Sequence, residues 1–207
     1  MTGSNAVPGF LPSVNGLHFA NDWEPGPTIR LGRVDPRWAG VGDARQGLCG
    51  GMTWFVRERF EAAQPIPPDV TAPANGSPLF RTIVRRQVLS LDWMRVPLRF
   101  WRLASMDRAR LTCRTLDVEW PRIRAEIDAG RPAMVGLVRH HGWNPMALDR
   151  DHQVLGFAYE TDGPSGPITI RLYDPNWPDR DDVALHLTSV GFRQSTGEPL
   201  LGVVSLR

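Results

Sequence analysis

One cysteine, one histidine and one aspartate stand where they could act together. Cys49 follows a glycine-containing turn and begins a stretch in which apolar residues recur every three or four positions. This spacing predicts an amphipathic helix to about Ala63, whose apolar face carries Met52, Phe55, Val56 and Phe60. A thiol at a helix N-terminus lies beside unpaired backbone N–H groups and the positive end of the helix dipole. That setting favours the thiolate, the nucleophilic form of cysteine.

A base and an orienting acid follow about a hundred residues later. His152 begins an apolar run that predicts a strand, and Asp174 ends the next predicted strand. If the two strands form an antiparallel hairpin, the start of one lies beside the end of the other, so these side chains become neighbours. Asp174 could then accept a hydrogen bond from one ring nitrogen while the other faces Cys49. Asn176 is a second candidate for the orienting role, because an amide oxygen also accepts.

Each of these residues alone fits an ordinary structural role, and only their combination in this order favours catalysis. The second cysteine, Cys113, lies in a segment without a glycine turn or a helix start. We expect an irregular or strand-like segment there, with Cys113 as a small buried hydrophobic residue. Two cysteines so far apart in a chain of 207 residues predict free thiols in a reducing compartment rather than a disulfide.

The predicted elements fall into a helical half and a sheet half. Residues 1–44 form an arm rich in Gly, Pro, Asn and Asp, residues 45–130 are mainly helical, and residues 131–207 form an antiparallel sheet. Besides the Cys49 helix, we expect helices over 78–91, 97–105 and 120–129, and strands over 133–138, 152–159, 168–173, 183–187 and 200–206. Helices followed by strands predict an α+β fold in a single domain.

Composition and charge exclude several classes of function. The formal net charge is +2, with 42% hydrophobic and 22% charged residues, so we expect a globular protein without the strong positive field that nucleic acid requires. No stretch approaches the roughly 18 apolar residues of a membrane span. The first ten residues lack the basic and apolar regions of a secretory signal, so we expect a cytoplasmic protein.

Cofactor and metal sites are not expected either. No glycine pattern typical of nucleotide binding occurs. His140 and His141 stand without the converging cysteines or carboxylates that zinc needs, so they predict a polar loop over the site rather than a metal centre. Trp143 and Trp177 lie next to the candidate catalytic residues, where substrate contact and simple packing remain equally open.

Four motifs share their order with a known family. They are Cys49-Gly50-Gly51 at a helix start, the run from Ile123 to Pro132 that leads into a strand, His152 to Phe157, and Tyr173-Asp174-Pro175-Asn176. Between residues 45 and 178 the chain resembles the papain-like cysteine peptidases, and it is most similar to the peptidases that cleave bacteriocin leader peptides after a double glycine. The resemblance implies Cys49 as nucleophile, His152 as base, Asp174 as orienting acid, and a peptide or protein substrate.

The residues before Cys49 depart from that family. Such peptidases usually carry a glutamine six residues before the cysteine, but here Asp43 holds that position and cannot donate when ionised. Gln46, or backbone N–H groups at the helix start, would then stabilise the oxyanion. A different alignment with papain places Met52 at the catalytic position, which would make the site inactive. The resemblance that places Cys49 at the catalytic position extends further along the chain, so we expect a cysteine hydrolase. An inactive peptide-binding domain and a transglutaminase-like acyl transferase remain as alternatives.

Overall fold

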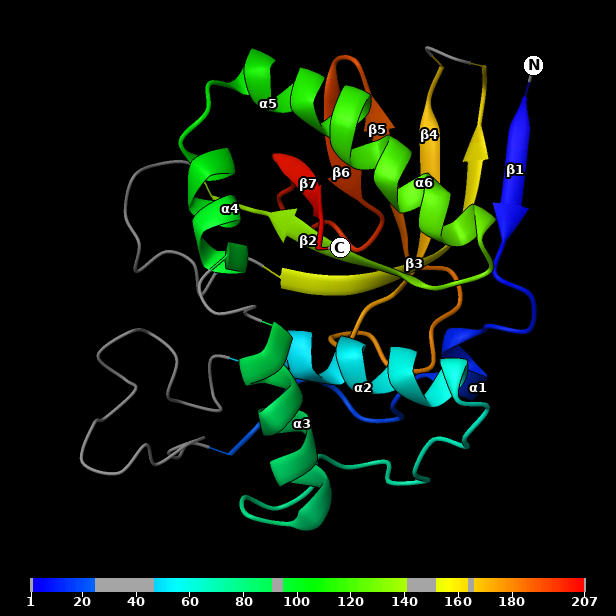
Figure 1. Ribbon diagram of the computed structural model, residues 1–207, viewed down its shortest axis with the longest axis vertical. Coiled ribbons are helices and arrows are strands. Elements are labelled where there is room, and N and C mark those ends of the chain that lie inside the picture. Colours follow the sequence, from blue (N-terminus) through cyan, green and yellow to red (C-terminus); the bar gives the residue numbers. More distant parts are fainter. Residues whose placement is uncertain (1, 25–46, 91–94, 141–151, 164–165, 207) are drawn as a thin grey trace.

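Within the described residues, a curled antiparallel sheet of seven strands forms the centre of the molecule (Figure 1). The computed structural model describes residues 2–24, 47–90, 95–140, 152–163 and 166–206. The strands run in the order β6-β5-β4-β3-β2-β7. The strand β1 also pairs with β3, on the part of β3 that extends past the first residue of β2. Their bounds are β1 (Gly3–Ala6), β2 (Ala133–Val138), β3 (His152–Thr161), β4 (Ile168–Tyr173), β5 (Ala184–Thr188), β6 (Gly191–Gln194) and β7 (Gly202–Ser205). The expected combination of helices with an antiparallel sheet is confirmed.

Helices cover the sheet from two sides. α2 packs against β3 with α3 beneath it, and α6 runs across the other side of β3 (Figure 1). The helical bounds are α1 (Pro12–Asn15), α2 (Cys49–Glu61), α3 (Pro78–Ser90), α4 (Arg95–Ala104), α5 (Arg108–Arg114), the π-helical turn η4 (Thr115–Glu119) and α6 (Trp120–Asp128). None of the helices in the described ranges is long and apolar enough to cross a membrane.

The helix that begins at Cys49 is a core helix rather than a surface helix. Met52 and Val56 are wholly buried, and they belong to the main hydrophobic cluster between the sheet, α2, α3 and α6. Arg57 is not part of the apolar face predicted for this helix, yet only 8% of it is exposed. Its guanidinium is held by Glu61 at 2.7 Å and by Glu126 of α6 at 2.8 Å, since a buried cation requires partners.

The glycine pair after Cys49 permits close packing of two helices. A Cβ atom added to Gly51 would lie 2.2 Å from the carbonyl oxygen of Ile83 in α3. One added to Gly50 would lie 2.6 Å from the hydroxyl of Ser90 at the end of α3. Any larger residue would push α3 away from the start of α2, so the Gly-Gly sequence fixes how the Cys49 helix sits in the core.

The prediction for Cys113 is wrong. This residue lies in helix α5 and is exposed, whereas Leu111 of the same helix is buried. The helix begins after Asp107, whose side chain accepts a hydrogen bond from the backbone of Arg110 at 2.9 Å, and it continues through η4 into α6. As expected, both cysteines are free thiols.

The described part of the N-terminal arm lies against the core. Phe10, Leu17, Phe19 and Trp23 are buried, but the segment from Leu17 to Phe19 is not a strand. The arm instead begins with β1, which the sequence did not predict because its residues are polar and only its backbone pairs with β3.

Candidate active site

The β3–β4 hairpin brings His152 and Asp174 together. The two strands are antiparallel with Leu155 opposite Tyr173, so the start of β3 lies beside the end of β4. The Nε2 atom of His152 lies 2.6 Å from Oδ1 of Asp174, and both side chains are buried. Because Asp174 holds Nε2, the nitrogen left for Cys49 is Nδ1.

Cys49 approaches His152 from the helix that packs against the sheet. It is the first residue of α2, which packs against β3. The ring of His152 and the backbone of Gln153 both lie close enough to its sulfur to lower the pKa of the thiol. The side chain of Cys49 is partly exposed. A thiol beside an imidazole, in a residue that is not fully enclosed, can act as a nucleophile.

The electrostatics of this cluster favour charge separation between sulfur and ring. Burial raises the pKa of the Cys49 thiol, but the charge of His152 and the hydrogen bonds from His152 and Gln153 outweigh it, so the pKa is lowered. Burial lowers the pKa of His152, but the charges and hydrogen bonds of Asp174 and Cys49 raise it to about 10. Both shifts favour a thiolate beside an imidazolium over a neutral thiol beside a neutral ring.

This ion pair predicts how the free energy of unfolding depends on pH. In the unfolded chain the cysteine has a pKa near 8.5 and the histidine near 6.5, so between about pH 6.5 and 8.5 both states bind one proton and the pair contributes no slope. Above about 8.5 the unfolded cysteine loses its proton. The native pair keeps the His152 proton until pH rises through about 10. Stability therefore falls by roughly 2 kcal/mol in that upper interval.

Urea unfolding from pH 6.5 to 10 measures this effect. The difference between the wild-type protein and a Cys49→Ala/His152→Gln double variant removes the contribution of all other groups. We expect a flat difference up to about pH 8.5 followed by a decline. A difference that declines from pH 6.5 onward would mean that a protonated His152 faces a neutral thiol, which would contradict the ion pair.

Asp174 is held from both sides by donors. Its Oδ1 accepts from the backbone N–H of Asn176 at 2.9 Å, in addition to His152, and its Oδ2 accepts from Nε2 of Gln194 at 2.6 Å. Burial raises the pKa of Asp174, but the charge of His152 and these hydrogen bonds outweigh it, so the pKa is lowered. The side chain of Asn176, the second candidate for the orienting role, instead accepts from Asn21 at 3.3 Å.

Asn21 joins the turn before Cys49 to the turn after Asp174. Its Oδ1 accepts from the backbone N–H of Leu48 at 2.7 Å, and its own backbone N–H donates to the carbonyl of Pro175 at 2.8 Å. Gly47 has a φ of +88°, and a Cβ there would lie 2.5 Å from Nδ2 of Asn21. The turn therefore needs glycine. No sequence pattern indicates this role, because Asn21 stands in a turn-rich segment far from Cys49 in the chain.

Within the described ranges, two backbone N–H groups at the start of α2 are free to donate hydrogen bonds. The N–H of Gly51 donates to Oε1 of Gln87 at 2.7 Å. In the described part of the chain, no hydrogen bond occupies the N–H groups of Cys49 or Gly50. Gln46 and Asp43 lie outside the described residues. Met52, which the alternative alignment would place at the catalytic position, is wholly buried in the core.

The other residues considered for the site have different surroundings. Trp177 is half-buried: its ring nitrogen donates to Glu198 at 3.0 Å, and the Arg180 guanidinium lies 5.4 Å from the ring centre. His140 is buried, whereas His141 and Trp143 lie outside the described residues. Among the residues that the structure describes, no group of three or more His, Cys, Asp or Glu side chains is arranged to hold a metal ion.

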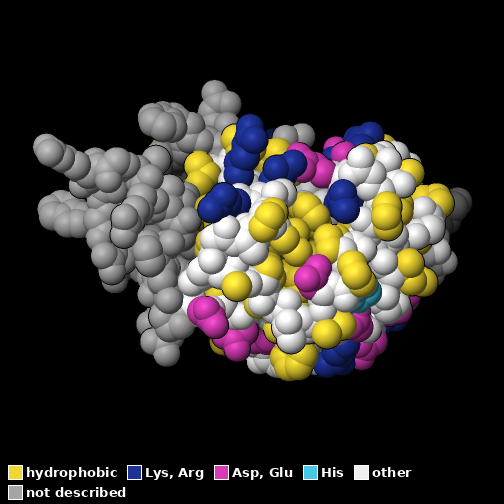
Figure 2. All heavy atoms as spheres, turned by 90° about the horizontal axis from the view of Figure 1, so that it is seen from below, with side chains coloured by type: hydrophobic (Ala, Val, Ile, Leu, Met, Phe, Trp, Pro, Cys, Tyr) yellow, Lys and Arg dark blue, Asp and Glu magenta, His cyan; other side chains and the backbone are white. Residues whose placement is uncertain are grey.

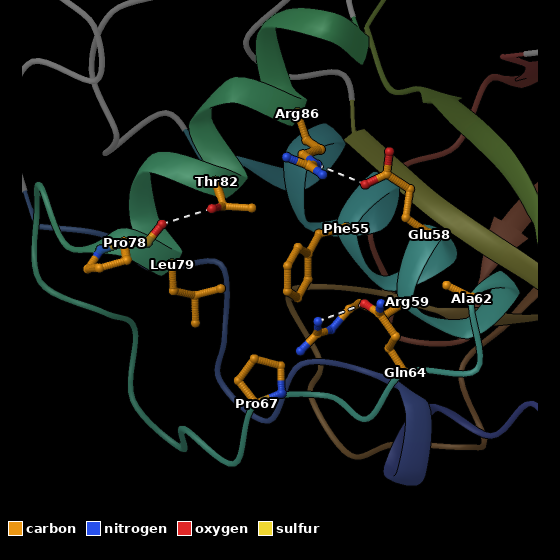
Figure 3. Close-up of a pocket in the computed structure, with 10 residues that line it drawn as sticks. All are labelled: Phe55, Glu58, Arg59, Ala62, Gln64, Pro67, Pro78, Leu79, Thr82 and Arg86. Atoms are coloured by element: carbon orange, nitrogen blue, oxygen red, sulfur yellow. Dashed lines mark hydrogen bonds and ion pairs between the residues drawn. The ribbon is translucent and has the colours of Figure 1, made fainter.

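A separate hollow of about 420 Å³ lies between α2 and α3. Figure 3 shows Phe55 and Leu79 facing it, with the Arg86–Glu58 ion pair on its rim at 2.8 Å. Figure 2 shows the same face of the molecule, where hydrophobic side chains gather in a depression among charged ones. Cys49, His152 and Asp174 do not line this hollow. The hollow is therefore separate from the cysteine cluster.

Comparison of the whole chain with protein-family models, with curated proteins and with solved structures found no match. The function therefore has to be inferred from the residues of the site itself. These are a thiol at a helix start, an imidazole that contacts it, and a buried carboxylate 2.6 Å from the far ring nitrogen.

Proposed function

We propose that the protein is a papain-like cysteine hydrolase that cleaves a peptide or amide bond. The observation that carries the proposal is the order Cys49–His152–Asp174, in which Nε2 of His152 lies 2.6 Å from Asp174 and the same ring lowers the pKa of the Cys49 thiol. This is the arrangement that an activated thiolate requires: a base beside the nucleophile, and an acceptor that fixes the tautomer and orientation of the base. The motif resemblance along residues 45–178 supports the same assignment.

The first half of the reaction is acylation. The sulfur of Cys49 attacks the carbonyl carbon of the substrate, and the carbonyl π electrons move onto its oxygen. The N–H groups of Cys49 and Gly50 at the start of α2 donate to that oxyanion. When the tetrahedral intermediate collapses, the C–N bond breaks and His152 gives its proton to the leaving amine. A thioester between Cys49 and the acyl part of the substrate remains.

The second half is deacylation. His152, now neutral, takes a proton from a water molecule as that water attacks the thioester carbon. Collapse of the second intermediate breaks the C–S bond, releases the carboxylic acid and restores the thiolate beside the imidazolium. Asp174 stays ionised throughout and stabilises the charge that His152 carries at each stage. An amine that attacks in place of water would give transglutaminase-like acyl transfer from the same thioester.

A library of peptides and amides, assayed by mass spectrometry, tests the proposal. We expect the wild-type protein to cleave members of the library and the Cys49→Ser variant to lose that activity, while Cys113→Ser retains it. Adding hydroxylamine identifies the thioester, because it diverts the acyl group to a hydroxamate. Cleavage that survives the Cys49→Ser substitution would contradict the proposal. A wild-type protein that binds peptides without turnover would support the inactive binding domain instead.

A further inference from the structure

The ends of two more strands extend the cluster beyond Asp174. Gln194 ends β6 and only 3% of it is exposed, while Arg139 directly follows β2. An Nη atom of Arg139 donates to Oε1 of Gln194 at 2.8 Å, and Nε2 of Gln194 donates to Oδ2 of Asp174 at 2.6 Å. The hydrogen bonds thus run without interruption from Arg139 through Gln194 and Asp174 to His152.

The chemistry of arginine fixes the direction of this chain. A guanidinium has only donors, so the oxygen of the Gln194 amide must face Arg139 and its nitrogen must face Asp174. The carboxylate of Asp174 then meets donors at both oxygens: His152 and the backbone of Asn176 at Oδ1, and Gln194 at Oδ2. Donors on both oxygens favour the ionised carboxylate and prevent it from rotating away from His152.

We propose that Gln194 is a positioning residue for the hydrolase, and that Arg139 sets the orientation of its amide. The inference rests on the proposed function, because it assigns these residues to the same thiolate–imidazolium pair. Gln194 does not contact the sulfur or the ring. It acts through Asp174: a fixed carboxylate with hydrogen-bond donors at both oxygens stabilises the imidazolium, and the imidazolium stabilises the thiolate. Loss of Gln194 therefore makes the imidazolium less stable, and with it the thiolate.

The test is the pH profile of Cys49 alkylation by iodoacetamide, with Cys113 as an exposed reference thiol in the same molecule. The acid limb of this profile is the pH range in which Cys49 becomes a thiolate, and the basic limb is the range in which His152 loses its proton. In Gln194→Leu we expect the acid limb to move up by about one pH unit and the basic limb to move down, because a charge-assisted hydrogen bond to Asp174 is lost. Alkylation on the acid limb should fall about tenfold. The kcat should fall with little change in KM, since no substrate contact is removed.

Two variants of Arg139 test the orientation and do not remove the donor to Asp174 itself. Arg139→Lys keeps a donor toward Gln194, and we expect its pH profile to match that of the wild-type protein. Arg139→Met lets the Gln194 amide turn over, so we expect its limbs to move in the same direction as those of Gln194→Leu, by about half a unit. The surface pair Arg59–Gln64, joined at 2.9 Å, provides the control: Gln64→Leu should leave both limbs unchanged.

The outcomes separate this inference from the proposed function. If the wild-type protein shows no enhanced reactivity of Cys49 at low pH, the proposed function itself fails. If the wild-type protein shows it but Gln194→Leu lowers only the unfolding midpoint and leaves both limbs in place, Gln194 is purely structural and the positioning role is overturned. If Arg139→Met also leaves the limbs in place, Arg139 does not orient the amide.

Discussion

Replacing His152 with glutamine is expected to slow the alkylation of Cys49 at pH 6 by about 100-fold or more. In the wild-type protein, the imidazolium and its hydrogen bond outweigh the effect of burial and lower the pKa of the thiol. Without the imidazolium, burial dominates and raises that pKa. Even an ordinary exposed thiol is only roughly 0.3% thiolate at pH 6. Mass spectrometry of both cysteines after brief exposure to iodoacetamide measures the ratio of Cys49 to Cys113 labelling.

The chain offers a matched control for this substitution. His18 also pairs with an aspartate, since its Nδ1 lies 2.6 Å from Oδ1 of Asp179, but this pair lies outside the cysteine cluster. We expect His18→Gln to leave the labelling ratio unchanged. Equal slowing in His18→Gln and His152→Gln would show a general loss of structure, and no slowing in His152→Gln would show that the imidazole does not activate the thiol.

The Asp174→Asn variant is expected to lose about 100- to 10,000-fold in kcat. Asparagine removes the charge that keeps the pKa of His152 high, so the imidazolium is less stable and the thiolate with it. The new amide also has one oxygen for three donors. If that oxygen stays toward His152, the new NH₂ group faces the NH₂ group of Gln194, so two donors meet. Turning the Gln194 amide over removes this conflict, but it then places the Gln194 NH₂ group against the Arg139 guanidinium, which is also a donor.

A loss of stability accompanies this loss of activity. A buried donor without an acceptor costs about 1–3 kcal/mol, so urea unfolding of Asp174→Asn should show a decrease of that size. Asp179→Asn is the control, because it removes the carboxylate beside His18, and asparagine tolerates the φ of +58° at this position. We expect its kcat to stay within about twofold of wild type. A kcat for Asp174→Asn that equals that of Asp179→Asn would contradict the orienting role of Asp174.

The parts of the site that could be predicted from sequence are those fixed by local pattern and simple topology. Cys49 stands at a glycine turn before a helical apolar pattern. His152 and Asp174 stand at the start and end of consecutive apolar strands. Antiparallel pairing of consecutive strands is the commonest connection, so the meeting of these two residues follows from the chain order alone.

Gln194 and Asn21 could not be predicted in this way. Gln194 ends a four-residue strand whose partially exposed sequence carries no clear alternation, and its role depends on the curl of the sheet that brings β6 near the end of β4. Asn21 acts through backbone contacts with turns far from it in the chain. Contacts of this kind depend on the tertiary arrangement, which no local periodicity encodes.

The predictions that are wrong elsewhere in the fold also fail because of side-chain partners. The helix around Cys113 was missed because it lacks a glycine or proline boundary, although Asp107 provides an N-cap. Arg57 has a charged side chain in a helix that is buried nearly all round, and only the positions of Glu61 and Glu126 explain why it lies inside. In both cases side-chain partners set the structure more strongly than the hydrophobic pattern did.

The proposed chemistry requires that Cys49 exists as a thiolate paired with the His152 imidazolium near neutral pH. The most direct measurement is the rate of Cys49 alkylation in the wild-type protein from pH 4 to pH 10. We predict that Cys49 remains reactive well below pH 7, at pH values where the exposed thiol of Cys113 reacts far more slowly. A Cys49 rate that rises only near pH 8.5, as for an ordinary thiol, would contradict the claim.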